Sequence, residues 1–302
     1  MKQILFSLLL LSAVSLVSCR KSGLQSDIKQ YDQQQILSYI AANGITNAQK
    51  DTVGGDTTGM YYQVLNVGNG ALLSYPDSVS FVYTIKSFDG KFIASDTVTN
   101  HYDNYLGHVS PNGLMLGINN DLMKKGGKVR FFIPSHLAYG VNGTGTGSKT
   151  ITNGRIAGNQ CLDYTVEVIN DEKAYDQLVI KNYLAANNLT GQYTETASGL
   201  WYKVTTPGTS TDPITYNSTV TLTYTGLLLN GTIFDQFNTT GGTQFNIPDV
   251  VPGFQEGLEH ATAGSSISFI MPSALGYGAT GGSGIPANSC LRYDCAIITV
   301  TP

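Results

Sequence analysis

The chain has 302 residues with 17 Lys and Arg against 21 Asp and Glu, which gives a net charge of −4. This length exceeds that of a usual single domain, so two domains are expected. The 34 Gly and 18 Tyr favour a β-rich fold with many turns. The acidic balance, with no cationic block beyond Arg20 and Lys21, excludes a typical nucleic-acid-binding protein.

The first residues are predicted to be a targeting segment. Residues 4–17 form an apolar run, too short for a comfortable membrane span, that ends in the sequence LVSC at 16–19. This ending resembles a bacterial lipobox, in which cleavage leaves Cys19 as the lipidated first residue; an ordinary secretory signal is the alternative. We therefore expect a signal peptide at 1–18, a tether at 19–25, and a lipid-anchored protein of the bacterial cell envelope. Arg20 after the cysteine favours the outer membrane and leaves the periplasmic or surface face open.

The chain repeats itself. Residues 31–43 (YDQQQILSYIAAN) match residues 175–187 (YDQLVIKNYLAAN), and residues 59–64 (GMYYQV) match residues 199–204 (GLWYKV). Further matches follow in the same order, at 81–84 (FVYT) and 222–225 (LTYT), and at 161–164 (CLDY) and 290–293 (CLRY). The order indicates a tandem duplication, with a first repeat at 26–170 and a second repeat at 171–302.

Each repeat is predicted to open with a helix, because apolar residues recur at helical spacing and Asn43-Gly44 and Asn187-Asn188 are good helix stops. Five or six short strands should follow, and another helix is expected within 250–263. Cys161 and Cys290 occupy matching positions in different repeats, while Cys290 and Cys295 lie too far apart along one strand to bridge. The expected architecture is α+β with no disulfide.

Four segments of the second repeat carry a family resemblance. They are 220–226 (VTLTYTG) followed by 230–235 (NGTIFD), then 250–258 (VVPGFQEGL), then 270–273 (IMPS) with 276–279 (GYGA), and finally 284–288 (GIPAN) leading into Tyr293. In this order and spacing the second repeat resembles the FKBP family of peptidyl-prolyl cis-trans isomerases. The resemblance implies two FKBP-like domains, each with a twisted antiparallel sheet wrapped on a short helix, plus an extra N-terminal helix per repeat.

The resemblance also implies a site for a prolyl peptide. Phe254 would form its floor, and the Tyr277 hydroxyl and the Val251 N–H would each bind a substrate carbonyl. Asp235 would place a carboxylate beside the reacting amide and hold the Tyr224 hydroxyl. The residues implied to form the site are Tyr224, Phe234, Asp235, Val250, Val251, Phe254, Tyr277, Ile285 and Tyr293.

The implied partners are proline-containing or unfolded polypeptides, macrolide inhibitors that fill the same site, and the membrane through the lipid anchor. No cofactor or metal is expected, because His101, His108, His136 and His260 lack ligand-like spacing with Cys or carboxylates. The loop at 143–150 lacks the glycine before Lys149 that a phosphate-binding loop requires.

Each site residue also has a purely structural interpretation. Leu222 and Tyr224 alternate as in any half-buried strand, and Asp235 can accept turn amides. Two functions therefore remain open: isomerisation of X-Pro bonds in exported proteins, mainly by the second repeat, or non-catalytic binding of such segments by both repeats. The complete set of Phe234, Asp235, Phe254 and Tyr277 favours the enzyme.

The first repeat departs from this pattern. Ile93-Ala94 aligns with Phe234-Asp235, which removes an aromatic residue and a carboxylate, and the stretch at 112–117 (NGLMLG) has no aromatic residue. The segment 134–140 (PSHLAYG) is intact, and a longer loop follows it. We therefore predict that the first repeat keeps the fold and has little or no activity.

Overall fold

A computed structural model describes residues 23–53, 57–120, 123–146 and 153–301. Cys19 and the apolar run at 4–17 lie outside these residues, so the targeting segment remains a prediction. Among the helices that the structure describes, none combines the length and the apolar character needed to cross a membrane.

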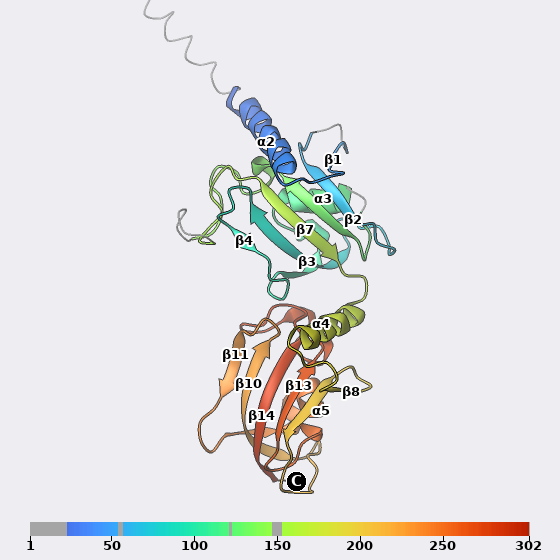
Figure 1. Cartoon of the computed structure of the whole chain (residues 1–302), viewed down its shortest axis with the longest axis vertical. Coiled ribbons are helices and arrows are strands. Elements are labelled where there is room, and N and C mark those ends of the chain that lie inside the picture. The colour runs from blue at the N-terminus through green and yellow to red at the C-terminus, as the bar shows by residue number, and fades with distance from the viewer. Residues whose placement is uncertain (1–22, 54–56, 121–122, 147–152, 302) are drawn as a thin grey trace, which may run out of the picture. The chain divides into compact units, whose positions relative to one another are not determined.

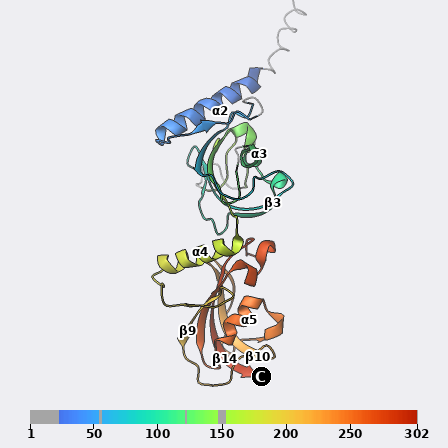
Figure 2. The same cartoon turned by 90° about the vertical axis from the view of Figure 1, so that its right-hand side faces the viewer.

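Each repeat is built on a seven-stranded sheet (Figures 1 and 2). The first sheet has the order β1-β2-β6-β7-β3-β4, with β5 paired to β3, and the second has the order β11-β10-β14-β13-β9-β8, with β12 paired to β10. The strands of the first sheet are β1 Gln49–Lys50, β2 Tyr61–Asn66, β3 Ser78–Ser87, β4 Ile93–Ala94, β5 His101–Tyr105, β6 Lys128–Ile133 and β7 Leu162–Val168. Those of the second are β8 Thr194–Glu195, β9 Trp201–Thr206, β10 Thr219–Leu228, β11 Ile233–Phe237, β12 Thr243–Asn246, β13 Ser266–Met271 and β14 Leu291–Thr301.

The strand count exceeds the predicted five or six because β1, β4 and β8 have only two residues each. Strand β10 shows strict alternation of buried and half-buried residues, which places one of its faces in the core. The tandem α+β architecture expected from the sequence is confirmed.

A helix opens each repeat, as predicted. Helix α2 spans Gly23–Ala42 and α4 spans Glu172–Ala186, and the turns after them contain Gly44 and Asn188 at φ of +59° and +57°. A buried carboxylate ties each helix to the turn that follows a strand of its sheet, β6 or β13: Asp32 accepts from Ser135 Oγ at 2.9 Å, and Asp176 accepts from Ser273 Oγ at 2.7 Å. The same carboxylates also accept from the buried thiols of Cys161 and Cys290.

Burial of the two cysteines raises the pKa of both thiols. Cys161, Cys290 and Cys295 are free and buried, and the first two act as donors to the helices and not as small apolar side chains alone.

A short helix lies against one face of each sheet, α3 at Asn112–Asn120 and α5 at Pro252–Glu259 (Figure 2). Two glycines four positions apart let each helix approach its sheet closely. In α5, a Cβ on Gly257 would lie 2.6 Å from the Phe269 ring, and one on Gly253 would lie 2.7 Å from Met271 Sδ. Gly113 and Gly117 face β6 in the same way, so these glycines align the two helices residue by residue.

The chain divides into two compact units. The first is formed by the chain up to Asp77, by Thr84–Ala94 and by Leu106–Val166. The second is formed by Ser78–Tyr83, Ser95–Tyr105 and the chain from Glu167 onwards. The first six of the ten residues of β3 and the whole of β5 therefore belong to the second compact unit. The domain boundary at 170/171 remains a prediction.

Candidate active site

An aromatic cluster lies between the strands of the second sheet and helix α5. The Phe254 ring lies edge-on to Tyr293 and Tyr224, with centroids 4.8 and 6.3 Å away. Phe254 is 4 % exposed and Tyr293 is 5 % exposed, so both rings are held in the core with little surface left over. Four of the nine residues implied by the resemblance are thus brought together around Phe254: Tyr224, Phe234, Tyr293 and Phe254 itself.

A β-bulge places Phe234 in this cluster. In the pairing of β10 with β11, Gly226 lies opposite Asp235 and Leu227 lies opposite Ile233, so Phe234 is the extra, unpaired residue. Bulges of this kind redirect a side chain relative to the regular pleat. The Phe234 ring lies edge-on to Tyr293 with the centroids 5.6 Å apart.

Gly226 makes room for the redirected ring. A Cβ at this position would lie 2.7 Å from Cζ of Phe234 and 3.0 Å from Cε1 of Tyr293. Both distances are shorter than any ordinary contact, so no other residue fits without displacing the two rings. The glycine of the segment 220–226 therefore has a steric role in the cluster, which the sequence pattern alone did not reveal.

A hydrogen bond joins the polar edge of the cluster. The Tyr224 hydroxyl donates to Asp235 Oδ2 at 2.6 Å, as the resemblance implied. Burial, followed by the bond to Asp235, raises the pKa of Tyr224 well above its usual value. The phenol therefore stays protonated at neutral pH, and Asp235 keeps an exposed carboxylate next to a buried aromatic wall.

The remaining residues implied by the resemblance lie on the two connections beside the cluster. Val250 and Val251 precede α5 and pack against the core that contains Phe254. Ile285 is 6 % exposed and belongs to the same core, whereas Tyr277 is 40 % exposed. Burial, followed by the neighbouring Tyr277 hydroxyl, raises the pKa of Tyr293, so the hydroxyls of Tyr277 and Tyr293 lie close together at the edge of the cluster.

Sequence reasoning missed two members of the cluster. Phe245 on β12 lies 5.6 Å from Tyr224 and 5.7 Å from Phe254, measured between ring centroids. Phe269 on β13 is fully buried, 5.6 Å from Phe254 and 5.7 Å from Tyr293. Both occur in short strands of ordinary composition, and only the pairing of β12 with β10 brings Phe245 to the site.

The first repeat has different residues at the equivalent positions. Leu114 N donates to Pro111 O at 2.9 Å, just as Phe254 N donates to Val251 O at 2.9 Å. This match puts Leu114 in the place of Phe254 and Pro111 in the place of Val251. Since proline has no N–H, the first repeat lacks the backbone donor that the resemblance implies for Val251.

The bulge is also absent from the first repeat. Strands β3 and β4 pair Ile85 with Ala94 and Lys86 with Ile93, without interruption. Ile85 therefore takes the place of Gly226, and Ile93 takes the place of the exposed Ile233 and not that of Phe234. This corrects the alignment of Ile93 with Phe234. The turn that follows is one residue longer in the first repeat. A hydrogen bond from Ser87 N to Phe92 O closes it, whereas a hydrogen bond from Leu228 N to Thr232 O closes the turn of the second repeat.

Comparison with known proteins agrees with this geometry. The model of the family described as FKBP-type peptidyl-prolyl cis-trans isomerase matches residues 73–169 and 211–298, which is more than half of the chain. The chain therefore belongs to the FKBP-type peptidyl-prolyl cis-trans isomerase family, and both repeats contribute to the match.

Several bacterial relatives share part of the chain. The FKBP-type isomerase FkpA of Aeromonas hydrophila is 37 % identical over 121 residues, covering 40 % of this chain and 45 % of the relative. Outer membrane protein MIP of Legionella longbeachae is 35 % identical over 120 residues, covering 39 % of this chain and 51 % of the relative. The crystal structure of FkpA from Escherichia coli is 32 % identical, with a TM-score of 0.39, over 43 % of this chain and 62 % of that one. The chain spans about half the length of the curated relatives it matches.

Proposed function

We propose that the protein is a peptidyl-prolyl cis-trans isomerase whose activity resides in the second repeat. The observation that carries this proposal is the complete aromatic cluster around Phe254, closed by the bond between Tyr224 and Asp235. The first repeat has Leu114, Ala94 and Pro111 at the corresponding positions, which supports a division of labour between the two. Its substrates would be X-Pro bonds in exported proteins, and macrolides that fill prolyl sites would inhibit it.

The reaction needs no bond to break. Rotation about an X-Pro amide faces a barrier of about 18–20 kcal/mol because the planar amide is stabilised by resonance. The twisted amide loses that resonance and its carbonyl becomes less polar, so an apolar surface favours it over the planar form. A site of this kind accelerates rotation by binding the transition state more strongly than the ground state.

The residues of the second repeat fit this mechanism. The rings of Phe254, Tyr293 and Phe234 would line the apolar site, and the hydroxyl of Tyr277 and the N–H of Val251 would bind substrate carbonyls. No group needs to gain or lose a proton during turnover. The direct test is an exchange assay on a prolyl peptide; a folded protein that gives no acceleration would favour the alternative of a non-catalytic binding module.

Replacing Val251 by proline tests the backbone donor. Val251 has φ −60° and Val250 has φ −104° and ψ 164°, both of which proline and its preceding residue can adopt. In the part of the chain that the structure describes, the Val251 N–H has no backbone acceptor, so proline removes no backbone hydrogen bond of the fold. One hydrogen bond contributes about 0.5–1.5 kcal/mol, so we expect a roughly three- to tenfold lower kcat/KM.

Val251→Ala is the matched control, because it shortens the same side chain and keeps the N–H. Equal rates for the proline and alanine variants would show that the N–H does not bind substrate. Circular dichroism and thermal unfolding of both variants would establish that the fold is intact.

We also propose a lipid anchor at Cys19. The proposal rests on the sequence at 16–19 and places the protein at the bacterial cell envelope, where exported clients fold. One acyl chain contributes about 0.8 kcal/mol per buried CH₂, so its loss should release the protein from membranes. We expect Cys19→Ala to move the protein from the detergent phase to the aqueous phase in a partition experiment. The variant Ser22→Ala lies outside the motif at 16–19 and serves as the control, and equal partitioning of the wild type and Cys19→Ala would remove the anchor.

A further inference from the structure

Two hollows of different volume occupy equivalent positions in the two repeats. The hollow of the first repeat, here called the first hollow, has a volume of about 230 Å³ and is lined by Tyr31, Gln35, Phe88, Asp89, Asn159, Gln160 and Cys161. That of the second repeat, the second hollow, has a volume of only about 30 Å³. Six of its lining residues match those of the first: Tyr175, Val179, Leu229, Asn288, Ser289 and Cys290.

The equivalence rests on backbone geometry as well as on sequence. Asn159 and Asn288 both have positive φ, at 58° and 51°. Their backbone N–H groups donate to Gly140 O at 2.8 Å and to Gly278 O at 2.9 Å. Asn159 and Asn288 therefore share a left-handed backbone conformation and an equivalent hydrogen bond, so they occupy the same position in the two repeats.

A segment of the chain fills the second hollow. This plug segment, Ser95–Tyr105, belongs to the second compact unit and supplies Thr97, Val98 and His101 to the lining. Asn288 Nδ2 donates to Asp103 Oδ2 at 2.7 Å, and Asn230 Nδ2 donates to Asp96 Oδ2 at 2.5 Å. The result is burial: Asn288 is only 7 % exposed.

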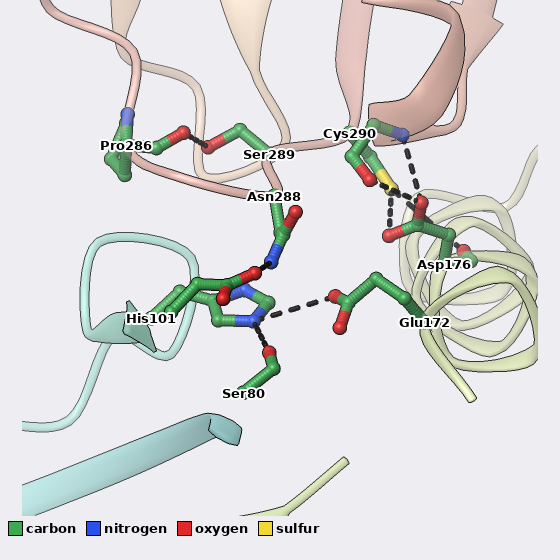
Figure 3. A network of polar contacts seen from close by, with 10 residues as sticks. Ser80, His101, Glu172, Asp176, Pro286, Asn288, Ser289 and Cys290 are labelled. Atoms are coloured by element: carbon green, nitrogen blue, oxygen red, sulfur yellow. Dashed lines mark hydrogen bonds and ion pairs between the residues drawn. The ribbon is translucent and has the colours of Figure 1, made fainter. Parts of the chain in front are cut away.

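The plug segment is further held by a histidine. Figure 3 shows His101 between Ser80 and Glu172, with Asn288 nearby, and its Nε2 lies 2.8 Å from Ser80 Oγ and 3.4 Å from Glu172 Oε1. The His101 ring also lies edge-on to Tyr175, with the centroids 6.1 Å apart. The plug segment is thus bound by the Asn288 amide and the Tyr175 ring of the second hollow, and by Glu172 outside its lining.

The first hollow presents the same kind of surface, and among the residues that the structure describes none fills it as the plug segment fills the second hollow. Tyr31 is 50 % exposed, and Asn159 is exposed where Asn288 is buried. The position of Asn230, which binds Asp96 of the plug segment, is taken by Asp89. Asp89 Oδ1 accepts from Ser87 Oγ and Lys91 N, and its side chain is exposed. A carboxylate here would repel Asp96 and attract a cation.

We propose that the first hollow docks an extended loop of a second polypeptide that presents a lysine or arginine to Asp89. The amides of Asn159, Gln35 and Gln160 would bind the backbone and polar side chains of that loop, as Asn288 binds the plug segment. None of the seven lining residues occupies a position of the prolyl site, so this surface is separate from the proposed isomerase activity. The proposed occupant carries a cation where the plug segment carries Asp96. This difference in charge disfavours binding of the plug segment in the first hollow and of the occupant in the second.

The test uses two synthetic peptides and the whole protein. The first peptide has the sequence of residues 95–103 (SDTVTNHYD), and the second differs by a lysine in place of Asp96. Binding is measured by fluorescence anisotropy of labelled peptide and mapped by amide shifts of Tyr31, Gln35 and Asn159. We expect the lysine peptide to bind about fivefold more tightly, because one partly exposed ion pair contributes up to about 1 kcal/mol.

Asp89→Asn makes the first hollow resemble the second and should remove or reverse this preference. Asp212→Asn, an exposed carboxylate of the second repeat, is the control and should leave the preference unchanged. The proposal is overturned if the lysine peptide shows no saturable binding at millimolar concentration, if both peptides bind equally, or if Asp89→Asn has no effect. Shifts confined to the second hollow would mean that the peptide merely displaces the plug segment, and would overturn it as well.

Discussion

Replacing Gly226 by isoleucine, the residue of the first repeat at this position, is expected to lower isomerase activity by about tenfold to a hundredfold. The new side chain would occupy the space of the Phe234 and Tyr293 rings, to which even a Cβ would be 2.7 and 3.0 Å away. A displacement of about 1 Å at a reacting centre can cost about a hundredfold in rate. Overpacking should also lower the free energy of unfolding by about 1–3 kcal/mol.

The measurement is kcat/KM in the prolyl exchange assay, with thermal unfolding alongside. Thr223→Ile introduces the same isoleucine on the same strand at a half-buried position and serves as the control, expected to keep most of the activity. If Gly226→Ile folds and retains wild-type activity, the Phe234 ring is not part of the site, and the bulge has only a structural role.

Removing the Phe254 ring should have the largest effect on stability. Phe254 contacts Tyr224, Phe245, Phe269 and Tyr293, and it is 4 % exposed. Phe→Ala substitutions in cores cost about 3–5 kcal/mol through lost transfer energy and the cavity left behind. We therefore expect Phe254→Ala to unfold at a much lower denaturant concentration and to lose most of its activity.

Phe254→Leu separates the two effects. Leucine is the residue of the first repeat at this place, so the fold tolerates it there, and the loss of stability should be smaller. If this variant is well folded and loses activity by tenfold or more, the aromatic surface itself promotes catalysis. Full activity in folded Phe254→Leu would contradict that role and would reopen the question of whether Leu114 leaves the first repeat active.

Particular residues show how far the sequence reached at the site. The bond from Tyr224 to Asp235 and the placement of Phe254 were expected from the family motif, because motif residues at fixed spacing imply a fixed geometry. Phe245 was not expected, since its strand carries no motif and reaches the cluster only through its pairing with β10. The sequence does not reveal the bulge at Phe234. The segments Gly226–Asp235 and Ile85–Ala94 have the same length, because the longer turn of the first repeat makes up for the bulge that it lacks.

The sequence by itself determined the tandem repeat, the helix that opens each repeat, the α+β class and the membership of a family with a prolyl site. These follow from local patterns: the turns that contain Gly44 and Asn188 end the helices where the motif predicts, and apolar alternation sets the buried face of β10. Only the tertiary structure decided which residue of one repeat replaces which residue of the other. The pairing register of the strands shows that Ile85 replaces Gly226, and the close contacts of Gly113 and Gly253 with their sheets align α3 with α5. Register and helix contacts both depend on residues far apart in the chain.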